Sequence, residues 1–337
     1  MKAPDNSPMV SVVMITFNQQ HCIDSAIAGV INQRTSFPVE LIVANDASTD
    51  DTLAHILRWQ QSYPDRIRII DHKTNVGFRA NYLSAVRQAS GRYMCMCDAD
   101  DYWIDSLKLS RQVEYMEAHP ECAITFHRVV NLYEPSGKKT LSNGGQAVDT
   151  DITHLSRSNY ITNLSVMYRR MLVPPEQLPD WIAETGLPDY AYHMLYAAHG
   201  TIHYFNKPMG LYRQSASGEW SLNGERHRLN MALDVRRHLI GYFGPDHAAT
   251  PGLTNASADI LIALMELARR SGDNEEYRRL TADLRLLLPD ITDSEISQRI
   301  DRRVALISST GGSSLKNALR KSWHRITRLL PTPKPCK

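Results

Sequence analysis

The sequence predicts an α/β protein with a mainly parallel sheet, followed by a C-terminal extension that is entirely helical. Two observations support this fold class. Through the first 130 residues, short apolar runs alternate four times with segments of helical periodicity, a pattern typical of parallel sheets with helices on both faces. From about residue 224 onward, only helical periodicity is present.

The four strand–helix repeats can be placed in order along the chain. The predicted strands span residues 9–17, 40–44, 66–70 and 93–97. The predicted helices span residues 22–33, 48–61, 78–89 and 105–118. The sequence Ser-Thr-Asp-Asp at residues 48–51 suits the N-cap and first turn of the second helix, because side-chain oxygens there accept from free backbone N–H groups. Gly91 and Pro120 mark the ends of the third and fourth helices.

After these repeats the pattern is less regular. Residues 134–150 predict a surface loop or hairpin, and further strands are expected at residues 163–168 and 201–205, with a helix at 190–199 between them. The helical extension is predicted at residues 225–242, 256–271, 275–287, 294–307 and 313–330. We therefore divide the chain into a sheet domain (1–222), a helical region (223–310) and a basic amphipathic tail (311–337).

The composition is that of an ordinary soluble globular protein, with 42% hydrophobic and 22% charged residues in a chain of 337. No apolar stretch approaches the roughly 18–20 residues that span a bilayer, and the first residues lack the apolar core of a signal peptide. The five cysteines show no paired C-x-x-C spacing. We therefore expect a reduced, cytoplasmic protein.

The last predicted helix, residues 313–330, combines an apolar face with positive charge. Residues 301–337 hold nine Lys and Arg against one acid, although the net charge of the whole chain is only +2. A basic amphipathic helix suits an anionic membrane surface, so we expect peripheral attachment at the inner face of the cell membrane. The alternative is packing against the helical region or against a second copy in a homo-oligomer. Nucleic acid is not expected as a partner, because basic and aromatic residues do not interleave along one surface.

Three carboxylates follow the fourth predicted strand, in the sequence Asp98-Ala99-Asp100-Asp101. Open α/β folds bind ligands at the carboxyl edge of the sheet, which is where this strand would deliver them. Like charges this close repel one another, and a divalent cation, Mg²⁺ or Mn²⁺, is the obvious partner for their oxygens. Asp98 and Asp100, two positions apart, would project to the same side of an extended segment. The alternative is an acidic turn that hydrogen-bonds only to the local backbone.

The other strand ends also carry polar residues. The first strand ends in Thr16-Phe17-Asn18, the second in Asn45-Asp46, and the third leads into Asn75–Asn81. Because parallel strands place their carboxyl ends at one edge, we expect these side chains to lie together. No strand is followed by G-x-G-x-x-G or by G-x-x-x-x-G-K-[ST], which argues against a dinucleotide-binding Rossmann domain and excludes a P-loop.

With these motifs the chain resembles the family 2 glycosyltransferases of the GT-A fold, in particular bacterial enzymes of surface-polysaccharide synthesis. The resemblance covers residues 9–221 and rests on four elements in the family's order: Asp98-Ala99-Asp100-Asp101-Tyr102-Trp103, Asp189-Tyr190, Tyr212-Arg213 and Gly218-Glu219-Trp220-Ser221. It implies an inverting, metal-dependent transferase. Such an enzyme moves a sugar from a nucleoside-diphosphate sugar, of the UDP or dTDP type, to a hydroxyl of a glycan or lipid-linked acceptor.

The resemblance also implies which residues bind the donor: Thr16, Phe17, Asn18, Asp46, Arg79, Asn81 and Asp98. Asp46 would accept a hydrogen bond from the imide N–H of a uracil or thymine ring, and its alternative role is to cap the helix that follows. Residues 16–18 would line the binding site of the base. Arg79 and Asn81 would reach the base or the phosphates.

For the chemical step, the resemblance implies that Asp100 binds the cation and that Asp98 faces the ribose or a metal-bound water. Asp189, at the start of a helix, would be the general base that takes the proton from the acceptor hydroxyl. Its alternative role is a helix cap favoured by the helix dipole. Arg213 and Trp220 would lie in the acceptor or diphosphate region.

One departure from the family keeps other functions open. Ser215 stands where relatives often have a His, and serine is a poorer ligand for metal or diphosphate. A non-catalytic glycan-binding or scaffolding protein of the same fold is therefore one alternative. A nucleotidyltransferase is another, but it would need a glycine-rich loop where the chain has residues 16–20. A phosphatase with a D-x-D nucleophile would usually carry that motif on the first strand.

Overall fold

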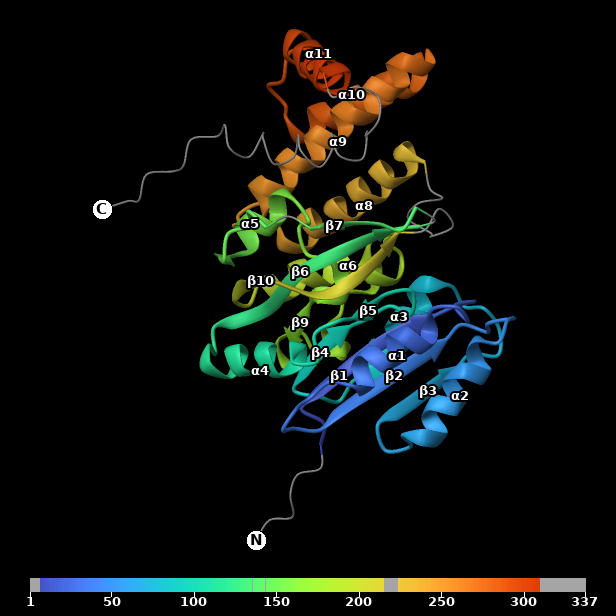
Figure 1. The fold of residues 1–337 in the computed structure, drawn as a ribbon. Helices are drawn as coiled ribbons and strands as arrows, with labels where there is room; N and C mark the ends of the chain where they lie inside the picture. The colour runs from blue at the N-terminus through green and yellow to red at the C-terminus, as the bar shows by residue number, and fades with distance from the viewer. Residues whose placement is uncertain (1–6, 135, 143, 215–223, 310–337) are drawn as a thin grey trace.

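The computed structural model describes residues 7–134, 136–142, 144–214 and 224–309. Ser215, Trp220 with the rest of its motif, and the predicted basic tail at residues 311–337 lie outside these ranges. The described chain is a mixed α/β structure with a ten-stranded sheet and a stack of C-terminal helices at one end of it (Figure 1). The predicted fold class is therefore confirmed.

The sheet has the strand order β3-β2-β1-β4-β9-β6-β10-β5, with β7 paired to β6 and β8 paired to β10. Strands β1 to β4 pair in parallel with one another, as do β6 and β10, and the other pairs are antiparallel. The strands are β1 (Val10–Thr16), β2 (Val39–Asn45), β3 (Ile67–Asp71), β4 (Tyr93–Met96), β5 (Tyr102–Trp103), β6 (Cys122–Tyr133), β7 (Lys138–Leu141), β8 (Asp149–Thr150), β9 (Met167–Arg169) and β10 (Thr201–Gln214).

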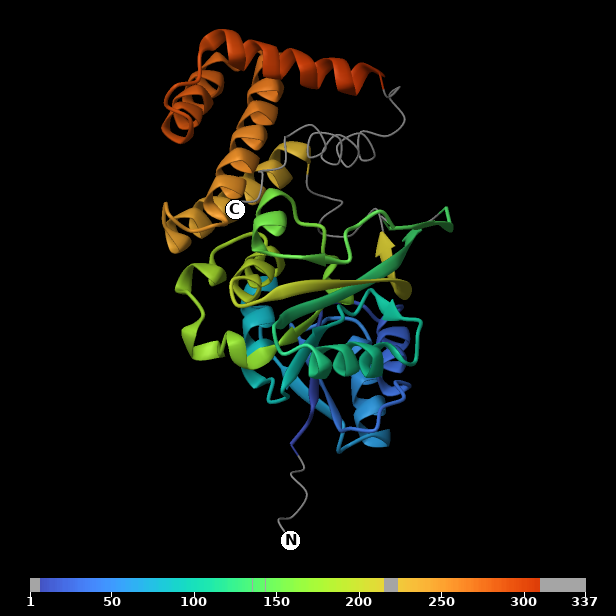
Figure 2. The ribbon, with the colours of Figure 1, turned by 90° about the vertical axis from the view of Figure 1, so that its left-hand side faces the viewer.

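Helices cover both faces of the sheet, as Figure 2 shows edge-on. One face carries α1 (Ile23–Ile31), α2 (Thr52–Ser62) and α4 (Lys108–Ala118). The other face carries α3 (Phe78–Gln88) and α6 (Pro188–Ala197).

The central strand β1 shows why the two layers form. Val12 and Met14 pack into the apolar cluster that holds α1 and α4, whereas Val13 and Ile15 pack into the cluster that holds α3 and α6. Alternate residues of a strand point to opposite faces, so an uninterrupted apolar strand must be covered twice. All seven residues of β1 are buried.

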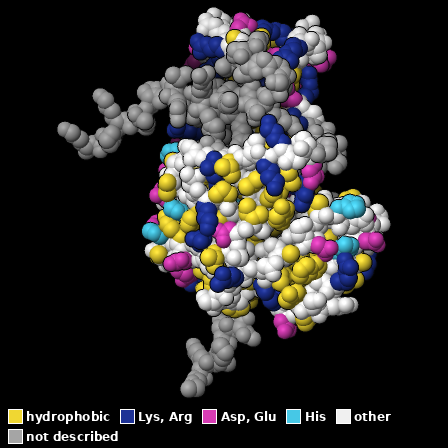
Figure 3. Space-filling model, in the orientation of Figure 1, with side chains coloured by type: hydrophobic (Ala, Val, Ile, Leu, Met, Phe, Trp, Pro, Cys, Tyr) yellow, Lys and Arg dark blue, Asp and Glu magenta, His cyan; other side chains and the backbone are white. Residues whose placement is uncertain are grey.

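The C-terminal helices form a second packing unit. They are α8 (Glu225–Phe243), α9 (Thr250–Ser271), α10 (Asn274–Leu287) and α11 (Asp293–Ser309). Leu264, Leu280 and Ile296 belong to their own apolar cluster, while Val235 and Leu239 of α8 pack into the cluster under the sheet. Lys and Arg side chains are prominent on this region, at the top of Figure 3. Within the described ranges, no helix is both long and apolar enough to cross a membrane.

Most predicted elements match the observed ones within a few residues, and the exceptions have local causes. The helix expected from residue 48 begins at Thr52, because the residues before it bind a neighbouring loop. Residues 163–168 are a 3₁₀ turn, η1 (Asn163–Ser165), that leads into β9, and not one strand. The strand expected at 201–205 continues to Gln214, since its bulged middle stays paired with β6. Strand β6 and the short helix α5 (Ile152–Arg157) were not predicted.

Gly200, just before β10, gives a test of this packing. A Cβ atom there would lie 2.2 Å from the backbone oxygen of Glu121, so Gly200→Ala should lower the free energy of unfolding by about 1–3 kcal/mol. The matched control is Gly241→Ala in α8, where a Cβ atom meets nothing within 4 Å and alanine favours the helix. Thermal melting should show a loss only in the first variant, and equal melting temperatures would contradict the fold described for this edge.

Candidate active site

The carboxyl ends of β1 and β2 meet at one edge of the sheet. Their pairing continues past the strands, because Asp46 N donates to Thr16 O at 3.0 Å. After each of the two strands the backbone turns sharply, and Asn18 and Ala47 have positive φ angles of 53° and 54°. Such conformations are costly for residues with a Cβ atom and concentrate at functional sites. The predicted convergence of polar strand ends is confirmed here.

The turn after β1 is bound to the turn after β2. Asn18 N donates to Ser48 Oγ at 2.9 Å, and Asn18 Oδ1 accepts from Thr49 N at 2.7 Å. Asp50 accepts from Gln20 N at 3.2 Å and from the first N–H of α2 at 3.0 Å. The sequence predicted that Ser48 and Thr49 cap α2, but in the structure they do not. They hold the Asn18 turn in place instead.

Asp46 is buried and holds the start of α3. Its two carboxylate oxygens accept from Val76 N at 2.7 Å and from Gly77 N at 2.9 Å, and its side chain is only 3% exposed. Gly77 has a φ of 85°, which a glycine tolerates without strain. The predicted alternative role of capping the following helix is wrong, because Asp46 binds the N-terminus of α3 and not that of α2.

The predicted donor residues near Asp46 differ in how tightly they are held. Asn81, in the first turn of α3, is buried and donates to Ala44 O at 3.0 Å, while its Oδ1 atom has no partner among the described residues. Phe17 and Phe78 are 45% and 38% exposed. Arg79 is exposed as well. At this edge of the sheet, the polar residues Asp46 and Asn81 are therefore buried, whereas the aromatic residues Phe17 and Phe78 are exposed.

The acidic segment after β4 is a turn, which corrects the predicted extended geometry. Asp101 N donates to Asp98 O at 3.0 Å, because the chain must reverse before β5 can pair with β10. The Asp101 carboxylate is buried and accepts from Arg213 N at 2.8 Å. The Arg213 guanidinium donates to Asp100 O at 2.8 Å and to Glu134 Oε1 at 2.9 Å. Arg213 therefore joins β10 to the acidic turn.

Only one of the two carboxylate oxygens of Asp98 has a hydrogen-bond partner in the described structure. Its Oδ2 atom accepts from Asn163 Nδ2 at 3.0 Å, and its buried Oδ1 atom has no partner in the described structure. Burial, with help from the charge of Asp100 and then of Asp189, raises the pKa of Asp98 to about 7. Burial also raises the pKa of Asp100, although Arg213 opposes this.

Asp189 lies in the first turn of α6, as the sequence predicted. Burial raises its pKa, against the effect of the backbone N–H groups of Asp189 and Tyr190 and of the Asn159 side chain. The charge of Asp189 in turn raises the pKa of Asp98. The two carboxylates are therefore electrostatic neighbours although they are far apart in the sequence.

Three residues of this site were not found from the sequence. Asn163 binds Asp98 from η1, Glu134 binds Arg213 from the end of β6, and Asn159 acts on Asp189. Each is a single polar residue with no motif around it. The pairing of β6, β9 and β10 brings Asn163 and Glu134 to the acidic turn.

The carboxylates present fit a divalent cation. Among the described residues, no three His, Cys, Asp or Glu side chains are arranged to hold a metal ion by themselves. Asp98 and Asp100 nevertheless offer the oxygen ligands that hard cations prefer, and Asp98 Oδ1 lacks a partner. Mg²⁺ commonly binds through one or two carboxylates and completes its shell with phosphate oxygens and water. The carboxylates of Asp98 and Asp100 are sufficient for this mode of Mg²⁺ binding.

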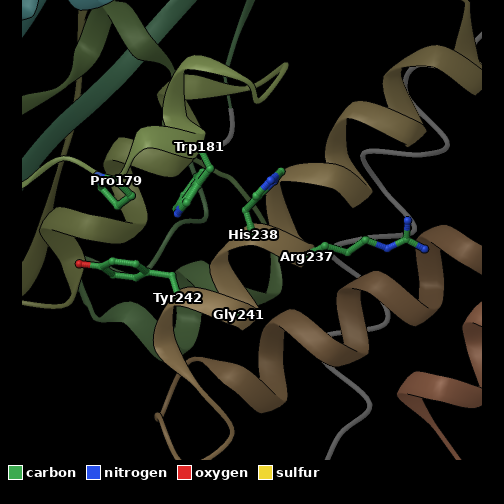
Figure 4. A pocket seen from close by; sticks show the side chains of 6 residues that line it. All are labelled: Pro179, Trp181, Arg237, His238, Gly241 and Tyr242. Atoms are coloured by element: carbon green, nitrogen blue, oxygen red, sulfur yellow. The ribbon is translucent and has the colours of Figure 1, made fainter.

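A separate hollow of about 540 Å³ lies between α8 and η4 (Asp180–Ala183). Figure 4 shows its lining of Pro179, Trp181, Arg237, His238, Gly241 and Tyr242, with Trp181 beside His238 and Arg237 pointing away. None of the residues predicted from the sequence lines it.

Comparison with known proteins finds a family that part of this chain resembles. Residues 11–173 match the family described as Glycosyl transferase family 2. An uncharacterised protein of Mycobacterium tuberculosis is 38% identical over 213 residues, which are 63% of this chain and 60% of the relative. The chain thus spans well under two thirds of that relative. A second relative is the Escherichia coli protein named UDP-Glc:alpha-D-GlcNAc-diphosphoundecaprenol beta-1,3-glucosyltransferase WfgD. It is 33% identical over 108 residues, which are 32% of this chain and 41% of the E. coli protein.

Among solved structures, the mannosyltransferase PcManGT from Pyrobaculum calidifontis, in complex with GDP-Man and Mn²⁺, has a TM-score of 0.57 with this chain. The match covers 97% of this chain and 86% of the mannosyltransferase at 18% identity. At this identity the likeness concerns the fold, which is the GT-A fold.

The raised pKa of Asp98 predicts how stability varies with pH. The pKa is about 7 in the folded protein against an ordinary value of 3.8, so the folded state binds the proton more tightly. Ionisation therefore lowers the free energy of unfolding progressively between about pH 4 and 7, and in full above that range. Asp98→Asn, which carries no charge, should melt above the wild-type protein at about pH 8 in EDTA and close to it at about pH 4.

Scanning fluorimetry across this pH range measures the difference. Asp65→Asn, at an exposed position, serves as the control and should show no such trend. A stabilisation by Asp98→Asn that stays constant with pH would contradict the assignment of an unmatched charge to Asp98.

Proposed function

Residues 11–173 match glycosyltransferase family 2, and from this match we propose that the protein transfers a sugar from a nucleoside-diphosphate sugar to a hydroxyl group of a glycan or lipid-linked acceptor. The observation that carries the proposal is the position of Asp98 and Asp100 after β4, a strand that pairs in parallel with β1, together with the effect of the Asp189 charge on the pKa of Asp98. Partly unmatched carboxylates at this position suit a substrate that brings its own phosphates and a cation.

The donor nucleotide would bind along the ends of β1 and β2. Asp46 is fixed by two backbone N–H groups, and each of its oxygens keeps a second lone pair for the imide N–H of a uracil or thymine ring. Phe17, at the exposed rim, offers a ring face for stacking. Asn81 presents an unpartnered oxygen from α3. These features favour a UDP or dTDP sugar as donor.

Asp100, together with Asp98, would hold a divalent cation, Mg²⁺ or Mn²⁺. When bound, such an ion neutralises the charge that develops on the departing diphosphate. Arg213 lies beside the same turn, where its guanidinium is paired with the Glu134 carboxylate. The mannosyltransferase of similar fold was crystallised with Mn²⁺, which supports this part of the proposal.

Asp189 would act as the general base toward the acceptor hydroxyl. A carboxylate whose pKa is raised by burial is a better base near neutral pH than an exposed one. With one carboxylate on the acceptor side and no second nucleophile assigned, the transfer would invert the anomeric carbon in a single displacement. Product stereochemistry tests this, and retention of configuration would contradict it.

A lipid-linked acceptor is the more specific part of the proposal. The name of the E. coli relative includes such an acceptor, a diphosphoundecaprenol-linked sugar. The basic amphipathic tail at residues 311–337 would bring the sheet domain (1–222) and the helical region (223–310) to the inner face of a membrane. Deleting this tail and measuring binding to anionic liposomes separates membrane attachment from packing within the protein or a homo-oligomer.

A panel of nucleotide sugars with Mg²⁺ or Mn²⁺ tests the function directly. Release of UDP or dTDP in the presence of an acceptor glycan would support a transferase. Binding of the glycan without any nucleotide release would favour the alternative of a non-catalytic glycan-binding protein of the same fold.

Asp100→Asn should reduce turnover about a hundredfold or more, a loss comparable to removal of a strong electrostatic stabiliser. The physical reason is that Asp100 is the acid that would bind the cation. The assay is nucleotide release at saturating Mn²⁺, with Asp65→Asn as an exposed control. Full activity of Asp100→Asn in EDTA would remove the metal-dependent mechanism.

Asp189→Asn should abolish transfer while nucleotide binding stays nearly unchanged, because the base acts on the acceptor. Calorimetry with UDP and dTDP, run beside the transfer assay, separates these effects. If nucleotide affinity and melting temperature fall together, Asp189 is a structural residue of α6 and not the base.

A further inference from the structure

Lys108, the first residue of α4, is a fully buried lysine. Its Nζ atom donates to Gln112 Oε1 at 2.7 Å, lies 3.9 Å from Cys95 Sγ and stands 4.0 Å from the centroid of the Trp103 ring. None of these three neighbours is a carboxylate. An apolar side chain of similar size would avoid the cost of burying an amino group, so stability alone does not explain this lysine.

The contacts of Lys108 reach both strands that border the acidic turn. Cys95 belongs to β4 and lies three residues before Asp98, whereas Trp103 belongs to β5 and lies two residues after Asp101. Trp103 is buried, and its ring offers the face on which the amino group rests. One side chain therefore contacts the strand that enters the turn and the strand that leaves it.

Gln112, one helical turn after Lys108, extends these contacts to η1. It is fully buried, and its Nε2 atom donates to Ser165 O at 3.1 Å. Because Lys108 donates to the amide oxygen of Gln112, the amide nitrogen is directed to η1. Trp103 Nε1 donates to Leu164 O of the same 3₁₀ turn at 2.9 Å. Two carbonyl groups of η1 are thus bound by two residues that Lys108 contacts.

The first residue of η1 is Asn163, whose Nδ2 atom donates to Asp98 Oδ2 at 3.0 Å. A continuous series of hydrogen bonds and backbone therefore links Lys108, through Gln112 and η1, to the carboxylate that follows β4. The charges that raise the pKa of Asp98 are those of Asp100 and Asp189, and Lys108 is not among them. Its influence on this carboxylate is therefore exerted through contacts and not through its charge.

We propose that Lys108 is a positioning residue of the candidate active site, which fixes the acidic turn and η1 relative to each other. This inference rests on the proposed function, in which Asp98 and Asp100 hold a divalent cation beside the nucleotide. Ligand oxygens must lie within about 0.2 Å of their preferred distances from the ion, so a small shift of β5 or η1 weakens its binding. Residues that orient metal ligands from outside typically contribute about tenfold or more to metal affinity.

Lys108→Met in the full-length protein tests the proposal. Methionine keeps an unbranched side chain in the core and removes the donor, which leaves Gln112 Oε1 buried without a partner and favours rearrangement of the side chain that binds Ser165 O. The relieved cost of the buried amino group offsets this loss, so the melting temperature should change by less than about 4 °C.

The measurement is calorimetry with UDP and dTDP, once in Mn²⁺ and once in EDTA. The ratio of the two nucleotide affinities gives the contribution of the cation. In Lys108→Met this ratio should fall about tenfold. The affinity in EDTA should stay unchanged, because the Asp46 end of the site is not linked to Lys108 by the contacts described above.

A second variant tests the connection to η1. Gln112→Glu keeps an acceptor for Lys108 and loses the donor to Ser165 O, so it should reproduce the fall in the ratio. If Lys108→Met does not fold, Gln112→Glu decides the question by itself, and an unchanged ratio there overturns the inference.

The matched control is Glu40→Gln at the other edge of the sheet. Glu40 is a buried carboxylate bound by Ser90 and Arg68, and it lies five residues before the end of β2, roughly 17 Å along the strand. This variant should melt at a lower temperature and keep the wild-type ratio. A loss of stability without a loss of cation contribution would show that the two effects are separable.

The outcomes separate the inference from the proposed function. A wild-type ratio in Lys108→Met, an equal loss of affinity in Mn²⁺ and in EDTA, or the same fall in Glu40→Gln overturns the positioning role and leaves the proposed function standing. If Mn²⁺ does not raise the nucleotide affinity of the wild-type protein, or if the wild-type protein binds neither nucleotide, the proposed function is overturned, and the inference with it.

Discussion

The parallel pairing of β1 between β2 and β4 is the constraint on which the rest of the structure depends. It buries β1 on both faces, so helices must cover the sheet twice. It also fixes where three strands end, and Asn18, Asp46, Asp98 and Asp100 follow those ends. The α8–α11 unit has its own core and attaches to this arrangement through α8 and through the start of α9, where Leu253 packs into the cluster under the sheet.

Local pattern was sufficient to predict the first half of the fold. Strands such as Val10–Thr16 are short, apolar and bounded by polar turns, and their helices have clear periodicity. The local sequence pattern did not predict segments whose structure depends on contacts with residues far away in the chain. Strand β6 mixes His127, Arg128 and Asn131 with apolar residues and acquires its length from β9, β10 and β7. Residues 163–165 look β-like, yet the backbone closes into a 3₁₀ turn because Trp103 and Gln112 bind its carbonyl groups.

The same limit applies to the site. Asp98, Asp100 and Asp189 stand in recognisable surroundings, and the charges of Asp100 and Asp189 both raise the pKa of Asp98, although their chemical roles stay proposals. Asn163 and Glu134 could not be found, because one asparagine and one glutamate carry no signal until their neighbours are known. The roles of Ser48 and Thr49 were misread for a related reason. Their side chains suit a helix N-cap, but the Asn18 turn, reached only through sheet pairing, offers them better partners.

The Asp46 carboxylate has a consequence for how a nucleotide would be held. It accepts from the N–H groups of Val76 and Gly77 in the turn that leads into α3, so a protein charge already lies near the positive end of that helix dipole. Many nucleotide-binding folds leave such a helix N-terminus free and place a phosphate on it. In the proposed function the diphosphate is balanced mainly from the side of the acidic turn, by a dissociable ion. Nucleotide occupancy would then follow the free cation concentration in the cell, and the supply of metal would set the rate at which substrate is captured.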